Sequence, residues 1–405
     1  MIGQLCTCDV DNFGDLLYPV IFRKMAEKHG IASAIVPLSF FQGPAPCDSG
    51  YVVQGINEVI KSPGRTLSHL VIGGGDILRT DVNMVATHYY SIFEKRAGNH
   101  FLFRMKKTFL GRQHLRNEFI KQFMGYSPIA PFILDNANHS RVGSIVYCSC
   151  GVPFRFPPEK SRAIREAFEA AAFVYVRDFP SRDKLREVGV NRDIEVSPDL
   201  IVTLSDFFAR DEERLKGVAL LAGYGVDIAK DIICFQSCPQ SQKNENELLQ
   251  QLTTLKKKTG AEIVLLPIGY CHGDDIFLQK LAERSGGSLI YIAAHSIYAT
   301  ISVLAACKLF VGTSMHGNIT AFSFGIPHLF GPIAVDKAEG FLDVVGLGAD
   351  FKLESWSQLA EKQAMVMRLP PDYFATRAEA AKKAVYATFG KIVEILKDAA
   401  PQQNL

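Results

Sequence analysis

The stretch from Gly312 to Leu329 reads GTSMHGNITAFSFGIPHL, and it predicts a strand, a turn and a helix in that order. Apolar residues 310–311 end the strand, and the small residues of 317–324 continue as a helix. The first amides of such a helix lack partners within it and, with the helix dipole, attract anions. His316 stands beside these amides and can donate a proton. The stretch therefore predicts an anion site with an acid–base group. A histidine that only caps its own helix is the alternative.

Four more segments carry glycines or charged residues at the end of an apolar run. They are Asp11-Asn12-Phe13-Gly14-Asp15, Gly73-Gly74-Gly75-Asp76, Val176-Arg177-Asp178 and Ser197-Pro198-Asp199. Ligands of parallel sheets bind beyond the carboxyl ends of the strands, so we expect these segments and His316 to share one site. For Asn12 and Asp15, which open the first predicted helix, turn formation and helix capping are an equally good interpretation.

Strand-like and helical runs alternate along the chain, which predicts an α/β fold with parallel sheets and right-handed crossovers. At 405 residues the chain is too long for one ordinary core. We expect a first Rossmann-like domain over 1–209, a charged linker over 210–216, a second such domain over 217–371, and a last helical segment over 372–405. In the first domain, the N-terminal strand is expected to reach residue 7, and residues 54–61 are expected to be helical.

The composition describes a folded protein without a strong overall charge. Hydrophobic residues make up 48% of the chain, and 44 basic residues stand against 42 acidic ones, for a net charge of +2. This balance gives no reason to expect nucleic acid as a partner. The start MIGQLCTCDV lacks the pattern of a secretory signal, and no run approaches the roughly 18 apolar residues of a membrane span. We therefore expect a cytoplasmic protein.

The nine cysteines include two close pairs, Cys6 with Cys8 and Cys148 with Cys150. Each pair falls on a predicted strand, where alternate residues share a face. Four thiolates could form a structural zinc site, but the two-residue spacer typical of such sites is missing. We expect buried free thiols and no metal.

The alternation is interrupted over about 80–127, inside the first domain. Residues 95–121 carry eight lysines and arginines against one acidic residue, Glu118, interleaved with phenylalanine, leucine and isoleucine. This mixture is typical of a helical segment that lies on an anionic membrane surface. An ordinary helical insertion, with its apolar side on the core and its basic side in water, fits equally well. Nucleic acid is disfavoured, because no recognised binding module accompanies the basic residues.

Taken in order, these segments resemble the polysaccharide pyruvyltransferase family over nearly the whole chain. The landmarks of that family appear as Asn12-Phe13-Gly14-Asp15, Gly73-Gly74-Gly75, Val176-Arg177-Asp178 with Ser181, Pro198-Asp199, and Thr313-Ser314-Met315-His316-Gly317 with Gly325-Ile326-Pro327. The resemblance implies two Rossmann-like domains that face each other across a cleft, as in GT-B glycosyltransferases. By analogy with that architecture, we expect the last helix to cross back onto the first domain.

The resemblance also implies a reaction. Phosphoenolpyruvate is the donor and co-substrate, with no bound cofactor, and the acceptor is a sugar of a polysaccharide or lipid-linked oligosaccharide, on which two hydroxyls close a pyruvate ketal. A protein with such an acceptor works in the cytoplasm or at the inner face of the membrane. His316 and Asp15 are the candidate catalytic residues. Candidate donor-binding residues are Arg177, Ser314, Met315, Gly317, Lys308 and Lys337, and candidate acceptor-binding residues are Asn12, Gly74, Gly75 and Asp76.

One position departs from the family pattern. Many members have arginine two residues before the histidine, where this chain has Ser314. A hydroxyl brings no charge, and charge-assisted hydrogen bonds are roughly twice as strong as neutral ones. Arg177, Lys308 and Lys337 are the candidates to supply the missing charge.

Two other functions stay open. A nucleotide-sugar glycosyltransferase would share the fold, although the second domain lacks the Glu-x7-Glu pair of many retaining enzymes, since the residue eight after Glu339 is Leu347. The other function is a catalytically silent subunit of a polysaccharide assembly complex, with which Ser314 is compatible.

Overall fold

The first of two sheets has eight strands in the order β3-β4-β2-β1-β5-β6-β7-β8, and every neighbouring pair except β3–β4 is parallel. The strands are β1 (Ile2–Leu5), β2 (Ile35–Ser39), β3 (Gly43–Pro44), β4 (Val52–Gly55), β5 (Leu67–Gly73), β6 (Val142–Cys150), β7 (Phe173–Val176) and β8 (Glu195–Val196). Apart from the short strands β3 and β8, this is the strand order of a Rossmann fold, and the order reverses between β1 and β5.

The second sheet has five strands, all parallel, in the order β11-β10-β9-β12-β13. They are β9 (Ile232–Gln236), β10 (Glu262–Leu265), β11 (Ile290–Tyr291), β12 (Leu309–Gly312) and β13 (His328–Phe330). Here the order reverses between β9 and β12. The predicted α/β class with two parallel sheets is therefore confirmed.

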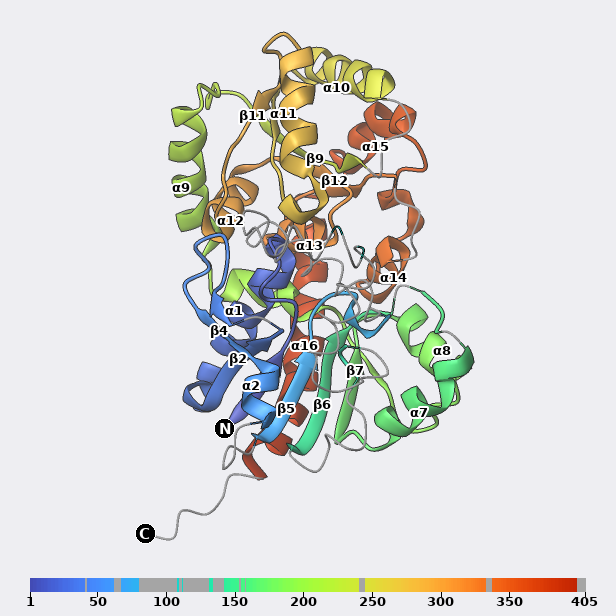
Figure 1. The fold of residues 1–405 in the computed structure, drawn as a ribbon. Helices are drawn as coiled ribbons and strands as arrows, with labels where there is room; N and C mark the ends of the chain where they lie inside the picture. Colours follow the sequence, from blue (N-terminus) through green and yellow to red (C-terminus); the bar gives the residue numbers. More distant parts are fainter. Residues whose placement is uncertain are drawn as a thin grey trace.

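Helices surround each sheet and form two lobes (Figure 1). The computed structural model describes residues 1–40, 42–61, 67–79, 108, 111, 131–133, 142–152, 154–156, 158–239, 245–332 and 337–398. Its α-helices are α1 (Phe13–Glu27), α2 (Ile56–Lys61), α7 (Ser161–Glu169), α8 (Phe179–Glu187), α9 (Arg210–Gly223), α10 (Glu245–Thr259), α11 (Asp274–Arg284), α12 (Ile297–Ala306), α13 (Met315–Ser323), α14 (Lys337–Val344), α15 (Leu359–Val366) and α16 (Tyr373–Asp398). Short 3-10 helices include η4 (Leu200–Asp206) and η6 (Tyr270–His272).

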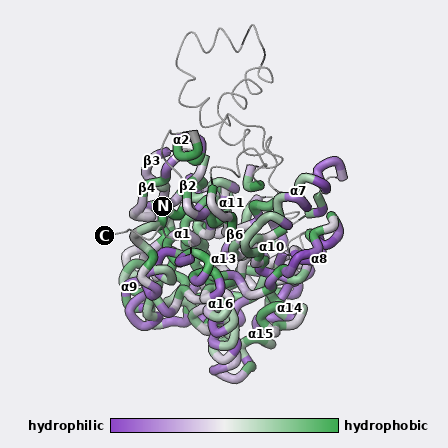
Figure 2. Tube along the Cα trace, turned by 90° about the horizontal axis from the view of Figure 1, so that it is seen from below, coloured by the Kyte–Doolittle hydropathy of each residue, from purple (hydrophilic) through white to green (hydrophobic). Residues whose placement is uncertain are grey.

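The hydrophobic core continues from one lobe into the other. Phe22 of α1, Leu200 of η4 and Ile319 of α13 belong to one cluster of buried residues. A second cluster covers the opposite face of the first sheet and includes Ile72 and Phe168. Figure 2 shows hydrophilic residues along the outer helix α8, whereas the buried helix α1 carries mainly hydrophobic ones.

Helix α16 follows the second lobe in sequence but lies along the first lobe (Figure 1). The ring of Phe389 packs edge-on against Phe22 of α1, with 5.3 Å between ring centroids. The Tyr386 hydroxyl donates to Asp206 Oδ2 over 2.8 Å. Since these contacts are both apolar and polar, α16 fastens the end of the chain to the first lobe.

Three local predictions need correction. The strand β1 ends at Leu5 rather than residue 7, and residues 52–55 form strand β4 before α2 begins. The charged stretch 210–216, expected as a linker, is instead the first half of α9. This helix packs closely on α12, and glycine at position 217 permits the approach, since a β-carbon there would lie 2.0 Å from the Ser302 carbonyl oxygen.

The cysteine pairs also differ from the prediction. Cys6 and Cys8 follow β1 instead of lying on it. Cys148 and Cys150 lie on β6 but belong to the cores on opposite faces of the sheet. Ser149 between them has a φ of 56°, and the pairing register shifts between Tyr147 and Cys150, so the alternation of faces breaks there.

The basic segment 95–121 lies, apart from Thr108 and Gly111, outside the described residues, so both of its interpretations remain predictions. Within the part of the chain that the structure describes, no helix combines the length and the apolar character needed to span a bilayer.

Candidate active site

The polar strand ends predicted from the sequence meet where the two lobes face each other. Asp15 follows β1 and Asp76 follows β5, on the two sides of the point where the strand order of the first sheet reverses. His316 follows β12, which borders the reversal in the second sheet. Crevices beyond the carboxyl ends of strands at such reversals are the usual ligand sites of open α/β sheets.

His316 projects from α13 against the first lobe. Its side chain is largely buried, and its Nε2 lies 3.8 Å from Oδ2 of Asp199. A β-carbon on Gly14, at the start of α1, would come within 1.7 Å of His316 Nδ1, so only glycine lets the turn approach the ring. The Phe13 amide donates to the carbonyl of Ile268 in the second lobe over 3.1 Å. The imidazole is therefore held between the lobes, and it is not a simple helix cap.

The first turn of α13 is partly satisfied from within the protein. The Ser314 hydroxyl accepts a hydrogen bond from the Gly317 amide over 3.2 Å, which makes Ser314 the N-cap. Its own amide donates to Gln236 Oε1 over 2.8 Å. Gln236 in turn donates to buried Asp274 over 2.7 Å. Among the described residues, no group accepts from the amides of Met315 and His316, and this leaves them to bind an anion at this end of the helix.

Arg177 lies at the centre of an ion network. Its guanidinium contacts Asp76 and lies 3.6 Å from Asp199 Oδ2 and 3.8 Å from Asp178 Oδ2. Only 2% of its side chain is exposed. In this conformation the guanidinium is paired with three carboxylates and buried. Arg177 therefore has no exposed face with which to bind phosphoenolpyruvate directly, as we expected it to do.

The four aspartates of the site divide into two classes by pKa. Burial raises the pKa of Asp15, against the hydrogen bond that its Oδ1 accepts from Thr7 over 2.6 Å. Burial likewise raises the pKa of Asp178. Burial also acts to raise the pKa of Asp76 and Asp199, but the positive charges of Arg177 and His316 outweigh it. Lys337 adds to this effect at Asp76. The pKa of each of these two carboxyl groups is therefore lowered. The site thus combines firmly ionised carboxylates with carboxyl groups that hold a proton more readily.

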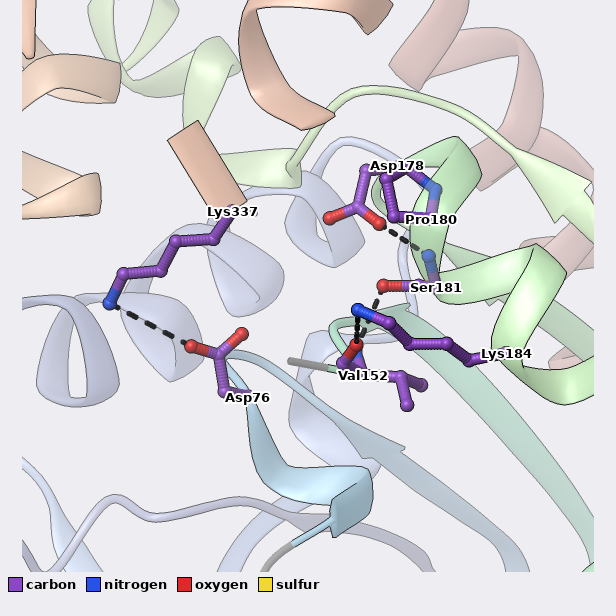
Figure 3. A pocket seen from close by; sticks show the side chains of 7 residues that line it. All are labelled: Asp76, Val152, Asp178, Pro180, Ser181, Lys184 and Lys337. Carbon is purple, nitrogen blue, oxygen red and sulfur yellow. Dashed lines mark hydrogen bonds and ion pairs between the residues drawn. The ribbon is translucent and has the colours of Figure 1, made fainter. Parts of the chain in front are cut away.

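A small hollow opens beside this network, lined by Asp76, Val152, Asp178, Pro180, Ser181, Lys184 and Lys337 (Figure 3). Lys337 Nζ lies 3.8 Å from Asp76 Oδ2, and a quarter of its side chain is exposed. Lys184 reaches the same hollow and donates to the Val152 carbonyl over 3.0 Å. The free space is about 10 Å³, room for about one water molecule. A larger ligand requires the lining to move apart.

Several predicted site residues have local structural tasks. The Asn12 side chain accepts from the Gly14 amide over 3.3 Å and caps α1. Gly74 and Gly75 have φ values of 84° and 70°, which suit glycine, and they turn the chain from β5 toward Asp76. A β-carbon on Gly75 would lie 3.0 Å from Asp15 Oδ1, so this turn borders Asp15.

Three predicted donor residues are not brought into the opening. Lys308 precedes β12 and is exposed at the amino end of the strand, opposite the end that carries His316, so it does not reach the site. The Met315 side chain is packed in the core. A β-carbon on Gly317 would meet Phe310 at 2.6 Å, so this glycine serves the packing of α13 on β12.

Other residues of the site were not assigned from the sequence. The sequence marks Asp199 only as a strand end, yet this residue lies between His316 and Arg177, and its Oδ1 caps η4. Lys184, on α8, and the buried pair Gln236–Asp274 carried no recognisable signal. Asp178 is the N-cap of α8, and its side chain accepts from the Ser181 amide. An aspartate directly before a helix is a recognisable signal for this role.

Comparison with known proteins gives a family and a fold. The sequence matches the profile of the family described as polysaccharide pyruvyl transferase over residues 12–330. A search of curated proteins finds no significant match.

Solved structures resemble this chain over nearly its whole length. One is Anabaena HepE in complex with UDP and glucose, with a TM-score of 0.53, 12% identity, and 98% of this chain and 99% of that chain covered. Another is a variant of the wall teichoic acid polymerase TagF, with a TM-score of 0.53, 10% identity, and 100% and 90% covered. A third is the UDP-N-acetylglucosamine 2-epimerase of Rickettsia bellii, with a TM-score of 0.55, 11% identity, and 98% and 95% covered. At such low identity these likenesses show the fold alone, and they confirm the GT-B-like arrangement of two Rossmann-like domains.

Proposed function

Because the chain belongs to the polysaccharide pyruvyl transferase family, we propose that it moves the pyruvyl group of phosphoenolpyruvate onto two hydroxyls of a sugar. The sugar belongs to a cell-surface polysaccharide or its lipid-linked precursor, and the product is a cyclic pyruvate ketal. The observation that carries the proposal is the position of His316 beside Asp199, with the turn that bears Asp15 packed against it from the other lobe.

The proposed reaction needs one acid and one base. Protonation of C3 of the enol makes C2 an oxocarbenium-like centre, and a sugar hydroxyl then adds to C2 and loses its proton. The bond from C2 to the phosphate oxygen breaks, and the leaving phosphate takes up one proton. The second hydroxyl then closes the ring at C2 with loss of another proton, which restores the acid. His316 is our candidate for the acid, with Asp199 stabilising the imidazolium form. Asp15 is our candidate for the base, because a carboxylate with a raised pKa accepts a proton more readily.

The donor carries a carboxylate and a phosphate, so it needs cations as well as amides. In our proposal Lys337 and Lys184 of the hollow meet these groups, together with the amides of Met315 and His316. Arg177 does not contact the donor in this proposal. It positions Asp76 and Asp199 through its ion pairs with them. The acceptor approaches from the first lobe along Asn12, Gly74, Gly75 and Asp76. The small volume of the hollow favours entry of the donor in a more open state of the two lobes.

The fold likeness to nucleotide-sugar enzymes does not by itself favour glycosyl transfer, because one fold hosts many activities. The sequence lacks the Glu-x7-Glu pair of many retaining glycosyltransferases. A catalytically silent subunit remains a distinct outcome of the test.

The test combines the full chain with phosphoenolpyruvate and a panel of oligosaccharide acceptors. We expect phosphate release that depends on the acceptor, and a product heavier by one pyruvate ketal. His316→Ala should lose this activity while the chain still unfolds in one cooperative transition. Nucleotide release from a sugar nucleotide would establish the glycosyltransferase instead, and no reaction with either donor class would support the silent subunit.

A further inference from the structure

A second cluster of reactive side chains lies where the lobes meet, and it contains none of the residues assigned to the proposed reaction. Asp11, Cys47 and His295 form it. Cys47 Sγ lies 2.7 Å from Asp11 Oδ1, and His295 Nε2 lies 2.8 Å from Asp11 Oδ2. One ligand atom from each residue lies within 4.8 Å of the other two.

We propose that Asp11, Cys47 and His295 bind a zinc ion that clamps the two lobes together. Thiolate sulfur, imidazole nitrogen and carboxylate oxygen are the three kinds of ligand that Zn²⁺ takes in proteins. Magnesium and calcium prefer sites made of oxygen alone, so the thiol and the imidazole select against them.

The spacing of the three groups suits this ion. Zinc–ligand distances of about 2.0–2.3 Å in a tetrahedron place neighbouring ligand atoms about 3.3–3.8 Å apart. The hydrogen-bonded pairs at 2.7 and 2.8 Å would open slightly around an ion, and every pair already lies within 4.8 Å. Binding would remove the thiol proton of Cys47 and leave the imidazole neutral, which makes zinc affinity rise with pH.

The backbone around Cys47 is held in an unfavourable conformation. Cys47 and Asp48 have φ values of 57° and 49°, in the left-handed region that residues other than glycine seldom adopt. Two such residues in succession direct the Cys47 thiol at Asp11. Strain of this kind persists where surrounding structure enforces it, and it gathers at ligand sites.

The ligands come from both lobes. Asp11 and Cys47 belong to the first lobe, and His295 lies two residues before α12 of the second. The backbone is joined at the same place, because the Cys271 amide donates to the Asp11 carbonyl over 2.9 Å and the Ile297 amide donates to the Cys47 carbonyl over 3.3 Å. The fourth position is left for water or for the exposed Cys271, whose amide donates to Asp11 but whose thiol is not one of the three grouped ligands.

This proposal departs from the expectation of no metal, which considered only cysteine pairs close in sequence. Cys47 lies 36 residues and His295 lies 284 residues from Asp11. No spacing motif connects such distant residues.

The test uses the full chain, stripped with a chelator and then titrated with Zn²⁺ against a chromophoric competitor. Co²⁺ serves as a spectroscopic probe, since a cobalt–thiolate bond gives a charge-transfer band in the near ultraviolet. Cys47→Ser and His295→Ala remove ligands. Cys238→Ser and His29→Ala are matched controls at a half-buried cysteine and a half-buried histidine that are not part of the ligand group. Cys271→Ser identifies the fourth ligand, since it should weaken zinc binding if Cys271 is that ligand and leave it unchanged if water is.

We expect one equivalent of Zn²⁺ and a higher unfolding midpoint with the metal bound. Cys47→Ser and His295→Ala should each weaken zinc binding by at least about tenfold. Cys47→Ser should abolish the cobalt–thiolate band if water is the fourth ligand, and weaken it if Cys271 is. The controls should bind as the wild type does. His295→Gln, which keeps a hydrogen-bonding side chain, should also lose zinc affinity, and it serves if the alanine variant unfolds. Absence of zinc binding at micromolar concentrations, or binding that survives both ligand variants, would overturn the proposal.

Discussion

Gly14 and His316 belong to different lobes, yet they are so close that a β-carbon on Gly14 would lie 1.7 Å from His316 Nδ1. The family landmark around Asn12 and Gly14 therefore has a physical reason. Gly14 leaves room for the imidazole of His316. Asp15, the next residue, therefore also lies near that ring. A constraint this tight makes the position of His316 dependent on a residue about 300 positions away in the chain.

The first prediction follows from that contact. Gly14→Ala should displace the His316 ring and lower turnover by about 100-fold or more, because small misplacements of a catalytic group have effects of this size. The unfolding free energy should fall by about 1–3 kcal/mol from overpacking. Gly390→Ala on α16 is the control, since nothing lies within 4 Å of its added β-carbon. Wild-type turnover in Gly14→Ala would show that His316 need not hold this position.

Asp15 offers a prediction about pH. Its pKa is raised by burial, so ionisation costs stability, and the cost appears as the pH rises above the ordinary aspartate pKa of about 3.9. Asp15→Asn should therefore abolish turnover yet unfold at a higher temperature than the wild type at pH 8, with a smaller difference at pH 4. Thermal unfolding at both pH values measures this. Asp183→Asn on the surface of α8 is the control, and an equal difference at both pH values would contradict the burial argument.

Arg177 is predicted to act mainly through the carboxylates around it. Arg177→Met leaves Asp76, Asp178 and Asp199 without their cation, and this should lower the unfolding free energy by about 3–5 kcal/mol. Arg177→Lys should retain part of that stability but lose the planar contacts. Chemical denaturation and phosphoenolpyruvate titration of both variants are the measurements. A stable Arg177→Lys protein that loses only donor affinity would assign the arginine to the donor instead.

Ser314 can be tested with two variants. Ser314→Ala removes the cap of α13 and should cost about 1 kcal/mol of stability without adding charge. Ser314→Arg loses the same cap but restores the family's cation, so it should bind phosphoenolpyruvate more tightly than Ser314→Ala does. Calorimetric titration of both variants isolates the effect of the charge. Equal donor affinity in the two would mean that no space for the arginine side chain remains.

The basic segment gives a prediction from the sequence alone. Replacement of Lys106, Lys107 and Arg112 by Glu should release the protein from anionic lipid vesicles, because each basic residue near such a surface contributes about 1 kcal/mol. Sedimentation with vesicles of phosphatidylserine and phosphatidylcholine measures this, and neutral vesicles are the control. If the wild type does not bind, the segment is an ordinary insertion.

The sequence by itself determined the fold class and the order of the elements. Alternation of apolar strands with amphipathic helices is a local pattern, so strands such as Ile232–Gln236 and Phe173–Val176 could be predicted to the residue. The family landmarks lie at strand ends, and parallel sheets bring such ends together. His316, Asp15 and Asp76 could therefore be expected in one place before any coordinates were known.

Only the tertiary structure decided what each charged residue contacts. The sequence shows that Arg177 is positively charged, but it does not show that three aspartates surround it. That arrangement depends on Asp76, Asp178 and Asp199 meeting in the folded protein. Lys308 is near His316 in sequence and yet at the other end of a strand, because each residue advances a strand by about 3.3 Å. Asp11, Cys47 and His295 likewise form a cluster only because distant segments of the chain meet in the folded protein. Side-chain contacts between distant segments are set by how the lobes pack, and no local pattern records them.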